Sequence, residues 1–193
     1  MGIFDQFFGK KKIEKKGKDS QYLPEENSPT HIEFAQNYVG RGGKFVYCED
    51  AKDTRYYFES ILQENNWSPE DVLPQNEILS SFFGLSQVVK HPKAMVLHCE
   101  YLIANKGAIL ICNRQIQDRK LSDLPDNLII IASTNDFKAD VSEAMTAINS
   151  KYKNQLPTNI TTLNAFDPTK ENDFLSYGGS AKHLYLLVQE VNE

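Results

Sequence analysis

Apolar residues along this chain recur at helical spacing in some segments and form short continuous runs in others. The clearest helical stripe is made of residues on one predicted helix face: Phe137, Val141, Ala144, Met145 and Ile148. The same spacing predicts a helix with Ser28 as its N-cap, another with Asp50 as its N-cap, and a short helix over residues 77–83.

Short apolar runs between these helices predict strands. Residues 127–132 (NLIIIA) form a continuous β-branched run, which is typical of a strand buried on both faces. The other predicted strands cover residues 44–48, 72–73, 94–98, 108–112, 160–163 and 183–188. Because strands and helices alternate, the pattern predicts an α/β fold with a mixed, mostly parallel sheet that is flanked by helices on both faces.

Length and composition agree with one folded domain. The chain has 193 residues, of which 40% are hydrophobic and 24% are charged, as in soluble globular proteins. Residues 28–193 are predicted to form the domain, and residues 1–27 a flexible tail. No apolar run approaches the roughly 20 residues that span a bilayer. Three cysteines cannot form a disulfide framework, and no signal peptide is visible, so a cytoplasmic location is predicted.

Positive charge is concentrated near the amino terminus. Residues 10–18 (KKKIEKKGK) contain six lysines, although the whole chain carries a net charge of -5. Residues 3, 4, 7 and 8 before them (Ile, Phe, Phe, Phe) fall on one helix face. This pattern is typical of a helix that docks on a partner or on a membrane surface through residues 1–18, and equally of a solvated tail. The acidic remainder argues against nucleic-acid binding.

Generic chemical motifs are scarce. Walker, dinucleotide-binding, CxxC and HExxH motifs are absent, so no cofactor and no metal site is predicted. His98-Cys99-Glu100 offers three potential metal ligands in a row, but neighbours on a strand point to opposite faces, which favours a simple strand end. Cys48, Cys99 and Cys112 adjoin apolar runs and are predicted to be buried.

Residues 96–148 resemble the LUD domain of the lactate-utilisation family. The family pattern A-D-x-A-I-A-E-T-G-T is similar to residues 99–108 (CEYLIANKGA). The family motif R-x-x-S-L-L-P is similar to residues 119–125 (RKLSDLP), and the pattern G-P-x-x-L-H is similar to residues 178–183 (GGSAKH). The resemblance covers about residues 28–190.

The resemblance implies a CoA-transferase-like fold, in the group that includes ribose-phosphate isomerases. It also implies a link to the oxidation of L-lactate or other 2-hydroxy acids, beside iron–sulfur and flavin-type redox partner proteins. The family's Glu-Thr-Gly is Asn105-Lys106-Gly107 in this chain, and the Asn105 amide is neither a base nor a nucleophile. Whether the chain is an enzyme is therefore left open.

Three functional hypotheses follow. The first is a degenerate module that binds a small anionic ligand or a partner protein, because cations and backbone N–H groups near the glycine turns would stabilise an anion. The second is an active accessory enzyme of lactate oxidation in which Glu100 serves as the catalytic base. The third is an adaptor recruited to a membrane by the tail. A purely structural role for Gly107 and Arg119 is the remaining alternative.

The predicted ligand-binding residues lie near the glycine turns: Asn105, Lys106, Gly107, Arg119, Ser122, Gly178, Gly179, Ser180 and His183. We expect the turn at Gly107 and the start of the last strand to share one crevice. Gly178 and Gly179 would either allow close approach to a ligand or only permit a sharp turn into that strand.

Overall fold

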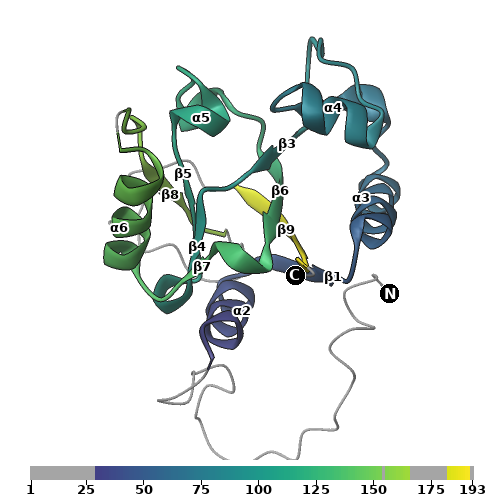
Figure 1. The fold of residues 1–193 in the computed structure, drawn as a ribbon. Helices are drawn as coiled ribbons and strands as arrows, with labels where there is room; N and C mark the ends of the chain where they lie inside the picture. Colours follow the sequence, from purple (N-terminus) through teal and green to yellow (C-terminus); the bar gives the residue numbers. More distant parts are fainter. Residues whose placement is uncertain (1–28, 154, 166–181, 192–193) are drawn as a thin grey trace, which may run out of the picture.

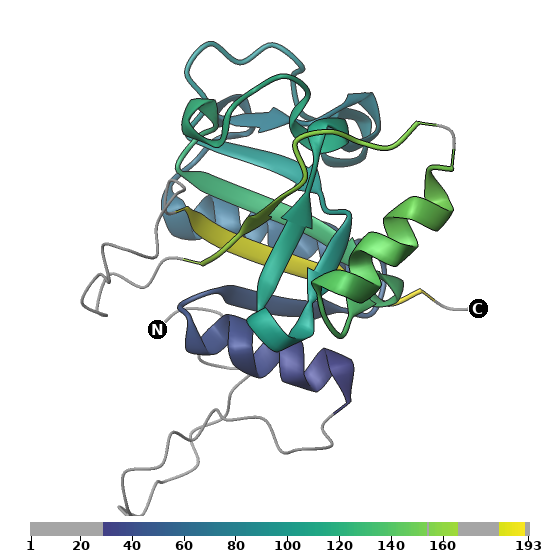
Figure 2. The same cartoon turned by 90° about the vertical axis from the view of Figure 1, so that its left-hand side faces the viewer.

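The strands lie in two sheets between layers of helices (Figures 1 and 2). The computed structural model describes residues 29–153, 155–165 and 182–191. In order across the first sheet, the strands are β1 (Lys44–Cys48), β9 (His183–Gln189), β6 (Asn127–Ser133), β3 (Ala94–His98) and β2 (Val72–Pro74). All four neighbouring pairs in this sheet are parallel.

A second, four-stranded sheet faces the first. Its strands, in order, are β7 (Phe137–Lys138), β4 (Tyr101–Ile103), β5 (Ala108–Ile111) and β8 (Thr161–Leu163). The β4–β5 and β5–β8 pairs are antiparallel, whereas β4 and β7 are parallel. The α-helices of the described residues are α2 (Thr30–Gly40), α3 (Ala51–Asn65), α4 (Glu77–Phe83), α5 (Asn113–Ile116) and α6 (Val141–Lys151).

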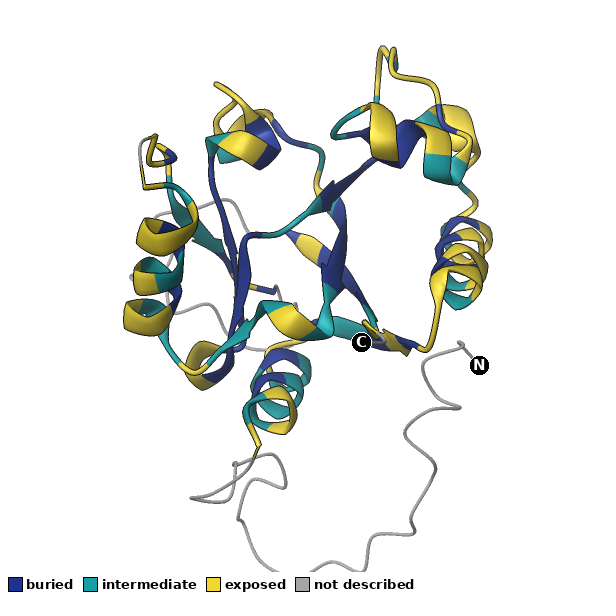
Figure 3. Cartoon of the chain, viewed as in Figure 1, coloured by how far each residue is buried: buried dark blue, intermediate teal, exposed yellow. Residues whose placement is uncertain are grey.

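The central strands are buried, whereas the helices expose their outer faces (Figure 3). Side chains that alternate along the strands pack into different layers. In β6, Ile129 and Ile131 pack in the core beneath α3 and α4, whereas Leu128 and Ile130 pack in the core between the two sheets. A strand with partners on both faces needs apolar side chains at every position, which explains the continuous run. Helix α6 covers the outer face of the second sheet through Ala144 and Ile148.

The predicted fold class is confirmed: this is an α/β domain with a mostly parallel sheet flanked by helices. The predicted strands at 108–112 and 160–163 fall in the second sheet, so one face of the parallel sheet is covered by that sheet together with α2 rather than by helices alone. Residues 101–103 form β4, a strand that the apolar pattern did not predict. The predicted tail at 1–27 lies outside the described residues.

Capping residues explain the helix ends. The Asp50 carboxylate accepts hydrogen bonds from the backbone N–H of Lys52 and Asp53 at 2.7 and 2.9 Å, which confirms the predicted start of α3. The predicted boundaries of two other helices are wrong. Pro29 rather than Ser28 is the N-cap of α2, because its ψ of 142° is not helical. Phe137 lies in β7, because Asp140 caps α6 three residues later.

A left-handed turn joins β4 to β5 and packs tightly on α2. Gly107 has a φ of +52°, and a Cβ at this position would lie 2.5 Å from the backbone of Asn37 and Tyr38. The Asn37 side chain also donates a hydrogen bond to the Ala104 carbonyl at 2.9 Å. Glycine is therefore required at position 107 both by the backbone angle and by the close approach of the helix.

We expect Gly107→Ala to lower the free energy of unfolding by about 2–4 kcal/mol, because it adds a backbone clash to the cost of the left-handed conformation. Gly84→Ala is the matched control, since Gly84 has a φ of +66° but a Cβ at that position would meet nothing within 4 Å. It should cost about 1 kcal/mol. Urea unfolding of both variants measures the difference, and equal losses would contradict a tight contact with α2.

Candidate functional site

A cavity of about 500 Å³ opens at the carboxyl ends of the parallel strands. Polar residues stand where these strands end: Gln75 follows β2, His98 ends β3, Ser133 ends β6 and Gln189 ends β9. The carboxyl edge is where open α/β sheets usually bind ligands, because the loops that follow the strands bring polar groups together there.

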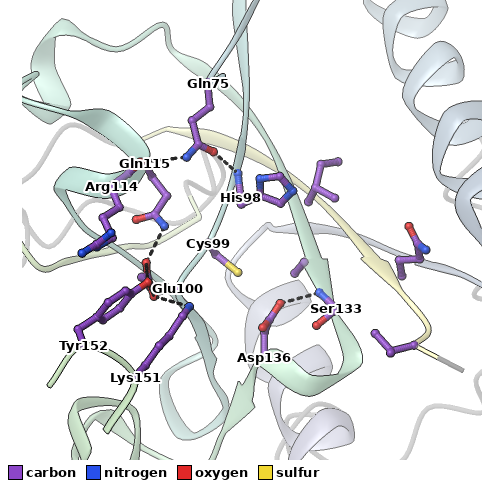
Figure 4. Close-up of a pocket in the computed structure, with 14 residues that line it drawn as sticks. Gln75, His98, Cys99, Glu100, Arg114, Gln115, Ser133, Asp136, Lys151 and Tyr152 are labelled. Atoms are coloured by element: carbon purple, nitrogen blue, oxygen red, sulfur yellow. Dashed lines mark hydrogen bonds and ion pairs between the residues drawn. The ribbon is translucent and has the colours of Figure 1, made fainter. Parts of the chain in front are cut away.

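Glu100 lies in the wall of this cavity, between β3 of the first sheet and β4 of the second (Figure 4). Its side chain is 2% exposed. One carboxylate oxygen, Oε1, accepts hydrogen bonds from Gln115 Nε2 at 2.8 Å and from Tyr152 Oη at 3.0 Å. The other, Oε2, lies 3.2 Å from Lys151 Nζ and 3.1 Å from Tyr152 Oη. The buried charge is thus compensated by donors from α5 and from the end of α6.

These donors decide the protonation of the group. Burial opposes ionisation of Glu100, but the hydrogen bond from Gln115 and the ammonium of Lys151 outweigh it, so the pKa of Glu100 is lowered. Partial burial works against the charge of Lys151, yet Tyr152 and the Glu100 carboxylate raise the pKa of the ammonium. Burial and the hydrogen bond to Glu100 raise the pKa of the Tyr152 phenol. The pair Glu100–Lys151 is therefore ionised at neutral pH.

Two cations lie close to the Tyr152 ring at this wall of the cavity. The Arg114 guanidinium lies 4.3 Å from the ring centroid, and Lys151 Nζ lies 5.0 Å from it. Arg114 also donates a long hydrogen bond of 3.4 Å to the Gln155 carbonyl. Half of the Lys151 side chain is exposed. Arg114 is also exposed, and guanidinium and ammonium groups that are accessible in this way can donate hydrogen bonds to an anionic group.

Uncharged and acidic groups from β3 and the β6–β7 connection line another part of the cavity. Burial lowers the pKa of His98 and keeps its imidazole neutral. Burial also raises the pKa of the Asp136 carboxyl, one oxygen of which accepts the Ser133 backbone N–H at 2.7 Å. Burial raises the pKa of the Cys99 thiol well above its usual value, so the sulfur is not an activated nucleophile.

Among the predicted site residues that the structure describes, Glu100 lines this cavity and the others do not. Asn105 and Lys106 are exposed at the opposite end of β4 from Glu100. At Gly107 the backbone of α2 fills the space where a side chain would stand, so the turn presents no crevice on that side.

The remaining predicted residues are dispersed. Arg119 and Ser122 lie beyond α5, outside the cavity lining, and the Ser122 hydroxyl donates to Asp123 at 3.1 Å. His183 begins β9 at the amino edge of the parallel sheet, whereas Glu100 follows β3 at its carboxyl edge. Residues 178–180 lie outside the described residues.

Sequence reasoning missed most of the residues around Glu100. Lys151 and Tyr152 end a helix some fifty positions further along the chain, and no spacing rule connects them to Glu100. The local pattern at His98-Cys99-Glu100 favours a simple strand end. The end of a parallel strand is, however, a usual place for a binding site. Polar residues after several predicted parallel strands would therefore have indicated a site at the carboxyl edge of the sheet.

The described residues hold no group of three or more His, Cys, Asp and Glu side chains placed to bind a metal ion. Over the same described ranges, no helix combines the length and the apolar character needed to cross a membrane.

The fold and cavity define an α/β protein with a polar site at the carboxyl edge of a parallel sheet. Comparison with known families matches the LUD domain to residues 84–188, more than half of the chain. The chain therefore belongs to the LUD domain family. It is also similar to the crystal structure of a DUF162 family protein from Deinococcus radiodurans, with a TM-score of 0.56 and 16% identity, over 83% of this chain and 96% of that one. No curated protein matches the chain.

The ionised, buried Glu100 yields a prediction about stability. Replacing it in Glu100→Gln should cost about 1–3 kcal/mol at pH 7, because Lys151 and Tyr152 lose a charged partner. The pKa of Glu100 is lower in the folded than in the unfolded chain. Its stabilisation is therefore complete above the unfolded value, near about 4.3, and is lost as the pH falls through the folded value.

Urea unfolding of wild type and variant between about pH 7 and about pH 3 should show a difference that shrinks on acidification. Glu59→Gln, at an exposed position of α3, is the control and should change stability by less than about 0.5 kcal/mol. If Glu100→Gln lowered the free energy of unfolding by the same amount at every pH in this range, Glu100 would not be ionised in the folded protein.

Proposed function

We propose that this LUD-domain protein binds a small anion, most simply a carboxylate, in the carboxyl-edge cavity. One observation carries the proposal: Arg114 and Lys151 both lie close to the Tyr152 ring at the cavity wall, and Lys151 is held there by the buried Glu100. A cation fixed before the ligand arrives loses less conformational entropy on binding. The proposed ligand would accept hydrogen bonds from both cations.

The contacts of Glu100 support a positioning role. Both of its oxygens already accept hydrogen bonds, and its lowered pKa makes it a weak base at neutral pH. These properties favour binding over the alternative in which Glu100 abstracts a proton as part of an accessory enzyme of lactate oxidation. Asn105, in the position of the family carboxylate, lies outside the cavity.

Family membership suggests which ligands to test first. The association of the family with lactate utilisation makes L-lactate and pyruvate the leading small carboxylates, and a role beside iron–sulfur or flavin-type redox proteins is part of the proposal. The cavity of about 500 Å³ lies in the size range of ordinary small-molecule sites. Recruitment to a membrane surface through residues 1–18 stays a prediction, because those residues lie outside the described ranges.

We expect Arg114→Gln to weaken binding of L-lactate or pyruvate by roughly 10- to 100-fold, because a charge-assisted hydrogen bond is lost. Arg119→Gln is the matched control: the same residue type lies five positions away but does not line the cavity. Isothermal titration of the full chain measures both. Absence of binding to these acids and to inorganic phosphate would overturn the proposal, as would equal losses in the two variants.

A further inference from the structure

A second cavity, of about 660 Å³, lies between α2 and the last described residues of the chain. We call it the α2 groove. Its apolar lining comes from α2, from alternate residues of β1, from β7 and from the carboxyl terminus: Ile32, Ala35, Phe45, Tyr47, Phe137 and Val191. No step of the proposed function uses it.

The α2 groove exposes apolar surface to solvent. Ile32, Tyr47 and Val191 are 41%, 40% and 45% exposed, and they are three of the seven large apolar side chains that are exposed in the described ranges. Their gathering at one groove differs from the scattered exposure that is normal on a protein surface. Burial of these side chains against an apolar partner would be favourable.

The rim of the α2 groove near the end of β1 is acidic. Glu190 lines the groove, and its backbone N–H donates to the Cys48 carbonyl at 2.9 Å, which places it beside the end of β1. Glu190 and Glu49, which directly follows this strand, both raise the pKa of the Tyr47 phenol, Glu190 by a hydrogen bond and Glu49 by its charge. An occupant with an apolar face next to a basic segment would therefore fit both the lining and the rim.

The amino-terminal segment of the same chain has this chemistry. Residues 3–8 carry four large apolar side chains at the spacing of one helix face, and residues 10–18 add six lysines and one glutamate, a net charge of +5. The remaining residues together carry -10, since the whole chain carries -5. Positive and negative charge are thus divided between this segment and the rest of the chain.

The segment that connects residues 3–8 to the α2 groove is long enough to let them meet. The described chain begins at Pro29, and Thr30, His31 and Ile32 themselves line the groove. Residues 9–28 separate the apolar face from this point and can span up to roughly 70 Å when extended. A partner tethered by such a linker is present at an effective concentration in the millimolar range, so weak contacts suffice for docking.

We propose that the apolar face of residues 3–8 docks in the α2 groove of its own chain, with the lysines of residues 10–18 against the acidic rim. The proposal does not depend on the ligand assigned to the other cavity, with which the groove shares Val191. The proposed occupant of the groove is the segment of the same chain, and not that of a second copy or a lipid surface.

The test uses the full chain with the photo-cross-linker p-benzoylphenylalanine in place of Phe7. Irradiation of the monomer should yield intramolecular cross-links to peptides that contain residues 30–47 or 190–191. Ile32→Glu should reduce the yield at least about fivefold, and so should Val191→Glu, which keeps the test valid if one variant is poorly folded. Ile78→Glu is the matched control, because Ile78 is 73% exposed on α4 and should leave the yield unchanged.

The salt concentration gives a second test. Raising it from about 50 to about 500 mM screens the attraction between the lysines and the acidic rim, and should therefore lower the cross-link yield. Cross-links that join two copies of the chain would overturn the proposal, as would cross-links spread over the surface. A cross-link yield that is unchanged in Ile32→Glu would overturn it too. Co-sedimentation with phosphatidylserine-containing vesicles, without a cross-link to the groove in their absence, would assign the segment to a membrane surface instead.

Discussion

The buried carboxylate of Glu100 constrains the whole carboxyl edge of this protein. The chain leaves the first sheet at His98 and enters the second at Tyr101, so Glu100 lies where the two sheets meet. A charge in that place is stable only when donors surround it. Gln115 and Lys151 supply them from two separate helices, and the cavity is bounded by the groups that meet this requirement.

This constraint shapes the chemistry that the site can perform. Because Glu100 accepts hydrogen bonds from Lys151 and Tyr152, it holds one cation in place and is not a free base. Arg114 then completes a positive wall, while burial keeps His98 neutral and raises the pKa of Asp136 on other parts of the lining. This arrangement is the basis of the proposal that the cavity holds an anion in a defined orientation.

Much of the fold was predictable because local rules decide it. β6 is buried on both faces and therefore had to be continuously apolar, and Asp50 caps its helix through hydrogen bonds to the next few residues. The separation into two sheets was not predictable from the apolar pattern. β4 is only three residues long, and its pairing with β5 depends on the turn at Gly107 and on the packing of α2 against it.

The sequence by itself determined the α/β class, most of the longer strands and helices, the family and the identity of Glu100 as a residue of interest, because periodicity, caps and motif order are encoded over short distances. Only the tertiary structure decided the site. Lys151 reaches the cavity from a helix that ends 51 residues after Glu100, and Arg114 reaches it from α5. Arg119, five residues after Arg114, and His183 do not line the cavity. Charge compensation is a relation between side chains in space, and local patterns do not contain it.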